Sequence, residues 1–348
     1  PAKMFHENYA FFSSTSKYMR IHFSKFSAAI QEHHLARYDD PFVVELGSND
    51  GIMLRDFAAQ NIRHLGIEPS KNVAEAARAT GVNTICEFFS EDVATQIVSK
   101  HGQADALLAA NVMCHIPDLT DVANGAQALL KPRGVLVFED PYLGDVVEKT
   151  SYDQIYDEHV FVFCALSVAN AFGRHGFELV DVEPQITHGG SMRYTLAKKG
   201  AKKPSKAVAL LITKEIELDR NRAETFDTFR QNCEASRDQL IAVLNDLRER
   251  GAKVAGYGAT SKSTTVINYC GITANHIAFI SDTTPTKQGK FSPGAHVPIR
   301  PYEDFVADYP HYTVLFAWNH IQEIMEKEQA YKAAGGKWIN FVPKVDIQ

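Results

Sequence analysis

Short apolar runs alternate with amphipathic stretches in the first part of the chain, between residues 42 and 140. Four runs have the length of buried strands: "PFVVELG", "HLGIEP", "ADALLAANV" and "RGVLVFED". The stretches between them carry apolar residues at helical spacing, and we expect helices at 52–60, 71–80, 91–101 and 119–130. This alternation predicts a mainly parallel sheet with helices on both faces.

The pattern then changes twice. "LSVANAFGRHGF" predicts a helix, and "ELVDVEPQ" with "SMRYTLAKK" predict a closing antiparallel pair. A lysine-rich hinge, "KKGAKKPSK", leads into a long helical region that ends at Gly251. Apolar residues recur there at three- and four-residue steps, which predicts a packing face made by Phe226, Phe229, Cys233, Leu240, Val243, Leu244 and Leu247. Strand, helix and strand alternate again from "VAGYGATSK" to "YTVLFAW".

These patterns predict an α/β protein, with a doubly wound Rossmann-like sheet followed by a second, smaller Rossmann-like domain. A length of 348 residues suits two domains. We expect an N-terminal lid or helical segment at 1–40, the first domain at 41–203, a helical linker at 204–250 and the second domain at 251–348.

Charge and composition narrow the ligand class. A net charge of -6 and a pI near 6.2 argue against nucleic-acid binding, which needs a basic surface. No apolar run approaches the roughly 18 residues that span a bilayer, so we expect no membrane insertion and a small-molecule partner. The five cysteines include no CxxC pair, and the chain opens on Pro1 without a basic-then-apolar leader. We expect a reducing, cytoplasmic setting and no metal site.

The first glycine turn, in "VVELGSNDGIML", has the pattern ExGxxxG formed by Glu45, Gly47 and Gly51. It is looser than the GxGxxG turn of dinucleotide sites and carries Asn49 and Asp50 where a phosphate would lie. Acidity at this place favours a cationic or zwitterionic ligand. S-adenosylmethionine fits, because its amine and sulfonium groups need acceptors.

Further residues follow the neighbouring predicted strands. Glu68 comes about 20 residues after the turn, where a carboxylate would hold a ribose diol. Glu87 and Phe88 could meet an adenine ring. Asn111 and His115 follow the fourth run, at the carboxyl edge where such sheets bind ligands, although His115 could equally be a helix cap or a surface residue.

The loop "YDQIYDEHV" places Tyr156, Glu158 and His159 just beyond the expected cofactor-binding edge. No regular element points all three side chains one way, but an irregular turn could. A histidine suits proton abstraction near neutrality, a carboxylate can fix its tautomer, and a tyrosine hydroxyl can stabilise an oxyanion. These three are our catalytic candidates; a solvated polar loop is the alternative.

Two other segments offer substrate contacts. In "THGGSMRY", His188 and Arg193 could line the same cleft, the alternative being a glycine turn with an exposed arginine. In "ENYAFFSSTSKYM" we expect a lid whose substrate contacts are Tyr9, Phe11, Ser13 and Ser14, although Ser14 could instead cap the following helix.

The second glycine turn, "VAGYGATSK", follows the dinucleotide fingerprint only in part, since Ser261 stands where the third glycine belongs. An NAD site and a purely packing domain are alternatives. We favour the diphosphate of a nucleotide as the ligand, with contacts from Tyr257, Ser261, Lys262 and Lys287.

An ordered motif set runs through nearly the whole chain: "ENYAFFSSTS", "VELGSNDGIML", "GIEPS", "NVMCHIPDL", "YDQIYDEHV", "HGGSMR", "GYGATSK" and "KQGKFSPGAHVPI". It resembles the sugar C-methyltransferases that alkylate nucleotide-linked 4-keto-6-deoxyhexoses. The resemblance implies S-adenosylmethionine in the first domain and a dTDP-type keto sugar as substrate. By match of motif, His159 would be the base, with Tyr156 and Glu158 as its companions.

The chain departs from that family in two respects. Relatives carry a cysteine-rich zinc module before the "SSTS" segment, and no such segment precedes it here, so we expect no structural zinc. Family members often have histidine in place of Asp157, and a polar aromatic residue or histidine where Phe11 and Phe12 stand, which leaves the sugar open. Other classes also stay open: an O- or N-methyltransferase, an NAD-dependent oxidoreductase and a non-catalytic nucleotide-sugar-binding protein. The chain could be a monomer or a homodimer.

Overall fold

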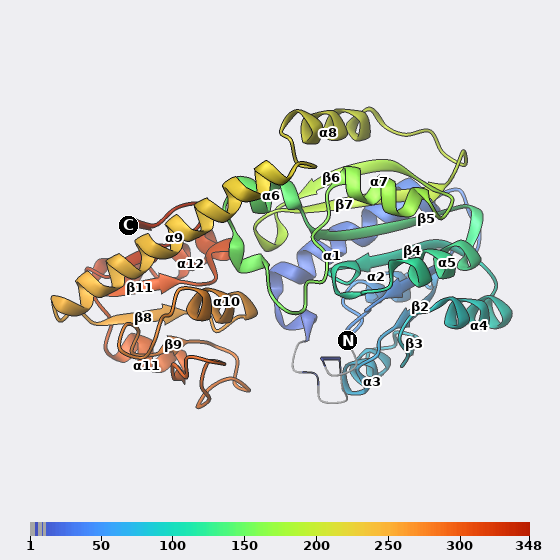
Figure 1. The fold of residues 1–348 in the computed structure, drawn as a ribbon. Helices are drawn as coiled ribbons and strands as arrows, with labels where there is room; N and C mark the ends of the chain where they lie inside the picture. Colours follow the sequence, from blue (N-terminus) through green and yellow to red (C-terminus); the bar gives the residue numbers. More distant parts are fainter. Residues whose placement is uncertain (1–3, 6–8, 10–11) are drawn as a thin grey trace. The chain divides into compact units, whose positions relative to one another are not determined.

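The computed structural model describes residues 4–5, 9 and 12–348 (Figure 1). The predicted contact residue Phe11 therefore lies outside the described part. The chain divides into two compact units. The N-terminal unit comprises Pro1–Tyr142, Val160–Gln185 and Ser191–Leu218, and the C-terminal unit comprises Leu143–His159, Ile186–Gly190 and Asp219–Gln348.

The N-terminal unit is built on a seven-stranded sheet of order β3-β2-β1-β4-β5-β7-β6. Its strands are β1 (Phe42–Leu46), β2 (Arg63–Ile67), β3 (Thr84–Ile85), β4 (Ala104–Ala110), β5 (Leu130–Pro141), β6 (Phe177–Gln185) and β7 (Ser191–Lys198). Strands β1 to β5 are parallel, whereas β7 is antiparallel to both of its neighbours. The strand order reverses direction between β1 and β4, which is where open α/β sheets bind ligands.

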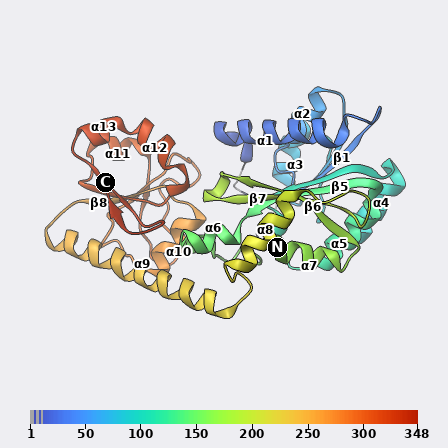
Figure 2. The same cartoon turned by 90° about the horizontal axis from the view of Figure 1, so that it is seen from above.

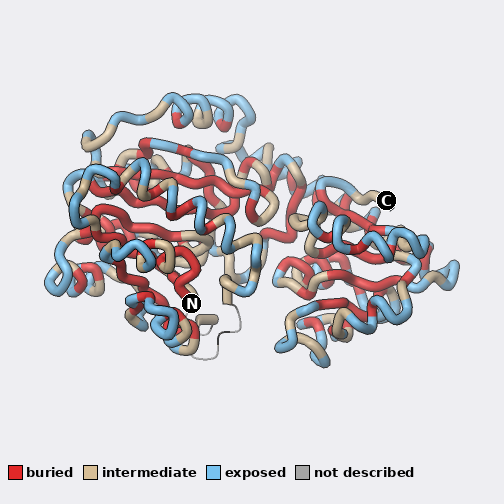
Figure 3. Tube along the Cα trace, turned by 180° about the vertical axis from the view of Figure 1, so that it is seen from behind, coloured by how far each residue is buried: buried red, intermediate tan, exposed pale blue. Residues whose placement is uncertain are grey.

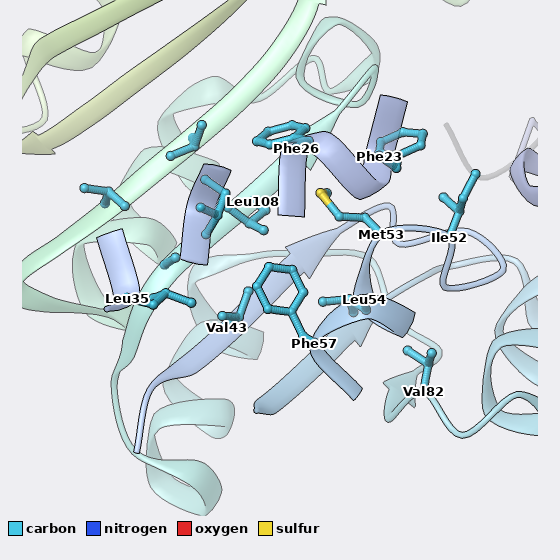
Figure 4. Packing of buried hydrophobic residues seen from close by; sticks show 14 of the residues in the cluster. Phe23, Phe26, Leu35, Val43, Ile52, Met53, Leu54, Phe57, Val82 and Leu108 are labelled. Carbon is cyan, nitrogen blue, oxygen red and sulfur yellow. The ribbon is translucent and has the colours of Figure 1, made fainter. Parts of the chain in front are cut away.

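Helices cover both faces of this sheet (Figure 2). They are α1 (Lys17–Ile30), α2 (Leu54–Ala59), α3 (Lys71–Ala79), α4 (Glu91–His101), α5 (Leu119–Leu129), α7 (Ala165–Gly173) and α8 (Lys206–Glu217), with short turns η1 (Ser13–Thr15), η2 (Gln31–Leu35) and η3 (Met113–His115). Phe23 and Phe26 of α1 pack with Phe57 of α2 and Val43 of β1 in one core (Figure 4). Burying such rings contributes roughly 1.5–3 kcal/mol each, so α1 belongs to the packed body of the unit.

The C-terminal unit has a six-stranded sheet of order β10-β9-β8-β11-β12-β13. Its strands are β8 (Val254–Tyr257), β9 (Ile280–Ser281), β10 (Ile299–Arg300), β11 (Tyr312–Leu315), β12 (Lys337–Asn340) and β13 (Asp346–Ile347). Its helices and turns are α6 (Leu143–Glu148), η4 (Tyr152–Gln154), η5 (Thr187–Gly189), α9 (Ala223–Glu249), α10 (Ser261–Tyr269), α11 (Tyr302–Ala307), η6 (Trp318–His320), α12 (Ile321–Lys327) and α13 (Gln329–Ala333). Buried chain runs through the middle of each sheet, while the helices expose their outer faces (Figure 3).

The α/β class and the doubly wound sheet predicted from the sequence are confirmed. The four helices expected between the first strands are present, and so is the closing antiparallel pair β6–β7. In the packing face of α9, Phe226 was placed wrongly, because its side chain is 40% exposed. The helical region also divides, since α8 belongs to the N-terminal unit and α9 to the C-terminal unit. No helix of the described residues has both the length and the apolarity needed to cross a membrane.

Two short segments that we expected in the first domain belong to the C-terminal unit instead. Residues 143–159 and 186–190 fall within the range 41–203 expected for the first domain, but they pack with the C-terminal unit. Tyr152 shows this packing, because its ring lies 5.3 Å from that of Tyr269 and 6.1 Å from that of Phe341. The loop of the catalytic candidates therefore belongs to the same unit as the second glycine turn.

Candidate active site

The first glycine turn follows β1 and requires its two glycines. Gly47 has a φ of 57° and Gly51 a φ of 77°, left-handed conformations that favour glycine. A Cβ at Gly47 would lie 2.5 Å from Val112 Cγ2, and one at Gly51 would lie 2.8 Å from Val82 Cγ2. The turn after β1 and the loop after β4 thus approach each other closely, at the switch point of the sheet.

Glu68, which follows β2, holds this turn in place. Its Oε2 accepts a hydrogen bond of 3.0 Å from Asn49 N, and its Oε1 accepts one of 2.8 Å from Ser70 N. Burial raises the pKa of Glu68, while the bonds from Ser70 and Asn49 oppose that rise. The remaining lone pairs of the carboxylate can still accept from a ribose diol.

The turn is lined by buried oxygens that make no hydrogen bond within the described residues: Glu45 Oε2, Ser48 Oγ and Asp50 Oδ1. Burial raises the pKa of Glu45 well above its usual value, and the charges of Glu68 and Asp50 add to the rise. Buried polar atoms are normally hydrogen-bonded, so these oxygens mark a place for donors from a ligand. A cationic ligand that approaches the backbone closely, such as S-adenosylmethionine, fits this turn.

The segment before α1 contacts the same turn. Ser13 N donates to Asn49 Oδ1 at 2.8 Å, and Ser14 N donates to Asp50 Oδ2 at 3.1 Å. The suggestion that Ser14 caps the following helix was wrong, because Ser16 Oγ accepts from Met19 N at the start of α1. Tyr9 contacts helix α3 instead, where its N donates to Asn72 Oδ1 at 3.3 Å.

The other cofactor candidates follow β3 and β4. Glu87 and Phe88 come after β3 with exposed side chains. Asn111 follows β4 with a φ of 56°, and its N donates to Glu139 O at 2.7 Å. His115 closes the short turn η3 and is partly buried. Glu87 and Phe88 thus follow the carboxyl end of β3, and Asn111 and His115 follow that of β4.

Arg193 lies inside the N-terminal unit, on β7, and not on an exposed turn. Its guanidinium bonds Glu139 Oε2 at 2.9 Å and Glu183 Oε2 at 3.0 Å, and it stacks on the ring of Phe26 at 3.7 Å. Glu139 Oε1 also contacts His22 Nε2 at 2.8 Å. These contacts indicate that Arg193 joins β5, β6, β7 and α1; its predicted substrate contact stays a prediction.

In the C-terminal unit, a tight turn brings Tyr156 and His159 together. His159 N donates to Tyr156 O at 2.9 Å, and the two rings lie 4.1 Å apart with planes inclined by 34°. His159 Nδ1 lies 2.8 Å from the carbonyl oxygen of Gln154. Since that oxygen can only accept, Nδ1 carries a proton, and in the neutral imidazole Nε2 then carries the lone pair. Glu158, between them in sequence, is partly buried.

His188 lies in η5, in the same unit, with a left-handed φ of 55°. Its neighbours hold the turn tightly. A Cβ at Gly189 would lie 2.1 Å from the Trp318 ring, and Lys149 Nζ donates to Gly189 O at 2.6 Å. The alternative of a glycine turn with an exposed arginine was wrong, because Arg193 is only 7% exposed.

The second glycine turn follows β8, and Asp282 holds it. Asp282 Oδ2 accepts from Ala259 N at 2.7 Å, and its Oδ1 accepts from Thr284 N at 2.8 Å. Gly258 has a φ of 91°, and a Cβ there would lie 2.9 Å from Ala317 Cβ. Lys287 Nζ donates to Ala259 O at 2.8 Å with a side chain that stays 40% exposed. The positively charged side chain of Lys287 therefore lies beside this turn.

Two of the predicted substrate contacts in this unit are engaged internally. The hydroxyl of Tyr257 donates to the buried Glu328 at 2.8 Å, which indicates that Tyr257 packs within the unit. Lys262 is 7% exposed, and its Nζ donates to His188 O at 3.0 Å. Burial lowers the pKa of Lys262 to about 8, against the charge of Asp153, which raises it. Ser261 opens α10 on its exposed side.

Sequence reasoning missed several residues that shape this part of the unit. Gln154 bonds both His159 and His188, and Trp318 Nε1 donates to Asp153 Oδ2 at 2.6 Å. The sequence spacing could not reveal the contacts of Gln154 with His188 and of Trp318 with Asp153, because these partners lie 34 and 165 positions apart. The contact between Gln154 and His159 lies within the loop itself.

A family model described as the C-methyltransferase C-terminal domain matches residues 186–343, and one described as a methyltransferase domain matches residues 20–182. The chain is 35% identical to the C-methyltransferase NovU of Streptomyces niveus over 307 residues, which is 88% of this chain and 73% of NovU. The chain belongs to the C-methyltransferase family. It is a methyltransferase whose methyl donor is S-adenosylmethionine, and the acidic first turn fits that donor.

Solved structures give weaker matches. Magnesium protoporphyrin IX methyltransferase of Synechocystis PCC 6803 with bound SAM is 11% identical, with a TM-score of 0.38 over 52% of this chain and 79% of its own. A SAM-dependent methyltransferase of Anabaena variabilis is 16% identical, with a TM-score of 0.39 over 50% of this chain and 84% of its own. At this distance neither match informs the activity.

Proposed function

We propose that this C-methyltransferase alkylates the carbon beside the ketone of a nucleotide-linked 4-keto-deoxysugar, with dTDP as the nucleotide. The observation that carries the proposal is the similarity to NovU, a C-methyltransferase, over 88% of the chain. A carbon is methylated as a nucleophile, and a proton beside a ketone can be removed when the enolate is stabilised. Such a site needs a base and a hydrogen-bond donor.

His159 is the proposed base. The bond from its Nδ1–H to the carbonyl oxygen of Gln154 fixes one tautomer, so that Nε2 can take up a proton. Histidine is the side chain that most often acts as a general base in enzymes. The nearby ring of Tyr156 restricts the imidazole further.

Tyr156 is the proposed donor to the enolate oxygen, and Glu158 its companion in the same turn. A phenol can donate a hydrogen bond to developing negative charge without giving up its proton at neutral pH. The imidazole of His188, in the same unit, is the second candidate for this donor.

The cofactor would be held by the first glycine turn. When bound, S-adenosylmethionine supplies an electrophilic methyl group. Glu45 and Asp50 offer acceptors to its cationic end, and Glu68 offers lone pairs to its ribose. Glu87 and Phe88, exposed after β3, are proposed to cover the adenine, with Asn111 and His115 completing the edge after β4.

The nucleotide of the substrate would lie at the second glycine turn. Helix α10 begins there with Ser261, and backbone N–H groups at a helix N-terminus favour phosphate. Lys287 adds a partly exposed cation beside Ala259. Contacts of Tyr9, Ser13, Ser14 and Arg193 with the sugar stay predictions, as do the cytoplasmic setting and the monomeric or dimeric state.

Mass spectrometry of a dTDP-4-keto-6-deoxyhexose panel tests this function. Each sugar is incubated with the enzyme and S-adenosylmethionine, and the products are searched for the gain of one methylene. Methylation of carbon in at least one sugar supports the proposal; methylation only at oxygen or nitrogen, or none with any keto sugar, contradicts it.

A base variant tests the assignment of His159. His159→Gln should lower turnover by about a hundredfold or more, the usual loss for a general base, because glutamine cannot accept the proton. Calorimetry should give an unchanged affinity for S-adenosylmethionine. Near-normal turnover in His159→Gln would refute the role.

A further inference from the structure

The carbonyl oxygen of His188 receives hydrogen bonds from two buried side chains inside the C-terminal unit. Lys262 Nζ donates to it at 3.0 Å from the first turn of α10, and Gln154 Nε2 donates to it from η4. Lys262 is 7% exposed and Gln154 2% exposed. A carbonyl oxygen has two lone pairs, so it can satisfy both donors at once.

Gln154 also makes the contact that fixes the imidazole of the proposed base. Its side-chain amide bonds His188, and its own backbone carbonyl accepts from His159 Nδ1 at 2.8 Å. Anchoring the amide therefore holds the carbonyl that selects the tautomer of His159. The His188 end of this chain of bonds is itself constrained, because its left-handed φ of 55° is uncommon for a residue other than glycine.

The position of the Lys262 ammonium is fixed on its other sides. It lies 5.3 Å from the ring centroid of Trp318, and the indole Nε1 of Trp318 donates to Asp153 Oδ2 at 2.6 Å. Asp153 precedes Gln154 in η4 and is fully buried. Lys262 thus stands among η4, η5 and η6 and faces the interior of the unit.

We propose that Lys262 and Gln154 are positioning residues, which hold the carbonyl oxygen of His188 from two sides and thereby keep His159 in its base-competent tautomer and orientation. The proposal rests on the proposed role of His159. It assigns Lys262 a task different from binding the diphosphate. Loss of positioning lowers kcat, whereas loss of a ground-state phosphate contact raises KM.

Two variants test the proposal. Lys262→Met keeps the length of the side chain but removes the donor, and Gln154→Glu keeps the shape but replaces the amide donor by an acceptor. With dTDP-4-keto-6-deoxyglucose and S-adenosylmethionine, each should lower kcat by about tenfold to a hundredfold, the scale of a small misplacement, and leave KM within about twofold. Lys262→Arg, which retains a donor, should recover part of the loss. If Lys262→Met does not fold, Gln154→Glu carries the test.

Matched controls come from the same unit. Lys253→Met removes a lysine whose Nζ pairs with Asp308 at 2.6 Å on the surface, and Gln329→Leu removes an exposed amide that bonds Met325 O. Both should keep the kcat and KM of the unchanged enzyme. These variants separate the effect of the His188 contacts from the general effect of losing a lysine or glutamine.

A spectroscopic readout keeps this proposal separate from the proposed function. Long-range ¹H–¹⁵N spectra of histidine-labelled enzyme, with His159 assigned from His159→Gln, should show the Nδ1–H tautomer in the unchanged protein and a mixture in both variants. This result supports positioning even if no keto sugar is methylated, in which case only the proposed function fails. An unchanged tautomer together with unchanged kcat, or a raised KM at constant kcat, would overturn the proposal.

Discussion

The two glycine turns of this protein use the same support and present opposite charge. In each, a carboxylate after the second strand of the unit accepts one hydrogen bond from the turn and one from the residue two positions further on. Glu68 does so with Asn49 N and Ser70 N, and Asp282 with Ala259 N and Thr284 N. Each turn also needs a glycine with positive φ beside a crowded neighbour.

The lining of the two turns differs. The first turn has the acids Glu45 and Asp50, each with a buried carboxyl oxygen that makes no hydrogen bond within the described part of the chain. The second has Lys287 beside Ala259, and its Asp282 lies 3.8 Å from that lysine. The difference between the two turns indicates that the strand–turn–helix backbone determines where a ligand can bind. The side chains at the turn determine whether that ligand is a cation or an anion.

Glycine substitution should separate the turns most strongly. Gly47→Ala should lower the affinity for S-adenosylmethionine by about tenfold or more and leave that for dTDP unchanged, because a left-handed alanine costs about 1–2 kcal/mol and meets Val112. Gly258→Ala should lower the affinity for dTDP and leave that for S-adenosylmethionine unchanged. Calorimetry measures both affinities. Gly102→Ala and Gly271→Ala are controls, with positive φ but no atom within 4 Å of the added Cβ; loss of both affinities in either turn variant would break the distinction.

Charge removal should have a smaller effect. Asp50→Asn should weaken S-adenosylmethionine binding by about threefold to tenfold, since one charge beside a cationic ligand contributes roughly 1 kcal/mol. Lys287→Met should weaken dTDP binding by a similar factor and reduce its dependence on salt. Asp92→Asn and Lys332→Met, at exposed positions, are the matched controls. Tighter binding of S-adenosylmethionine to Asp50→Asn would contradict the account of the first turn.

The pH dependence of stability should have opposite slopes in the two units. The folded protein keeps the Glu45 proton above the usual pKa of 4.5, so between 4.5 and the raised pKa it binds more protons than the unfolded chain, and stability falls as pH rises. Folded Lys262 loses its proton near pH 8 instead of 10.5, so the unfolded chain binds more protons in that window, and stability rises with pH.

Melting temperatures check these slopes. Relative to Glu45→Gln, the unchanged protein should lose a few degrees as pH rises from 4.5. Relative to Lys262→Met, it should gain a few degrees between pH 8 and 10.5, since each unit of pKa shift corresponds to about 1.4 kcal/mol. Equal slopes in the two comparisons would show that these groups do not titrate as described.

Much of the fold could be predicted from the sequence, because its long elements carry clear periodicity. The run "ADALLAANV" became β4, and the alternation around it gave the helices α4 and α5. The two-residue strands β3 and β10 were missed, since two residues carry no period.

The candidate site was predictable only where the signal is local. Glu68 stands at the spacing from the first turn that a ribose-binding carboxylate requires, and it does hold that turn. The contact of Lys262 with His188 spans 74 positions, and that of Trp318 with Asp153 spans 165. Such contacts depend on tertiary packing, which is why the loop of His159 was assigned to the first domain by sequence and packs with the second unit.

Solvent deuterium exchange tests the central claim of carbanion formation by His159 most directly. The enzyme is incubated in D₂O with dTDP-4-keto-6-deoxyglucose and S-adenosylhomocysteine, so that no methyl group is transferred, and deuterium at the carbon beside the ketone is followed by NMR. The account predicts rapid exchange with the unchanged enzyme and exchange slowed by about a hundredfold with His159→Gln. Equal exchange rates in the two proteins would contradict it.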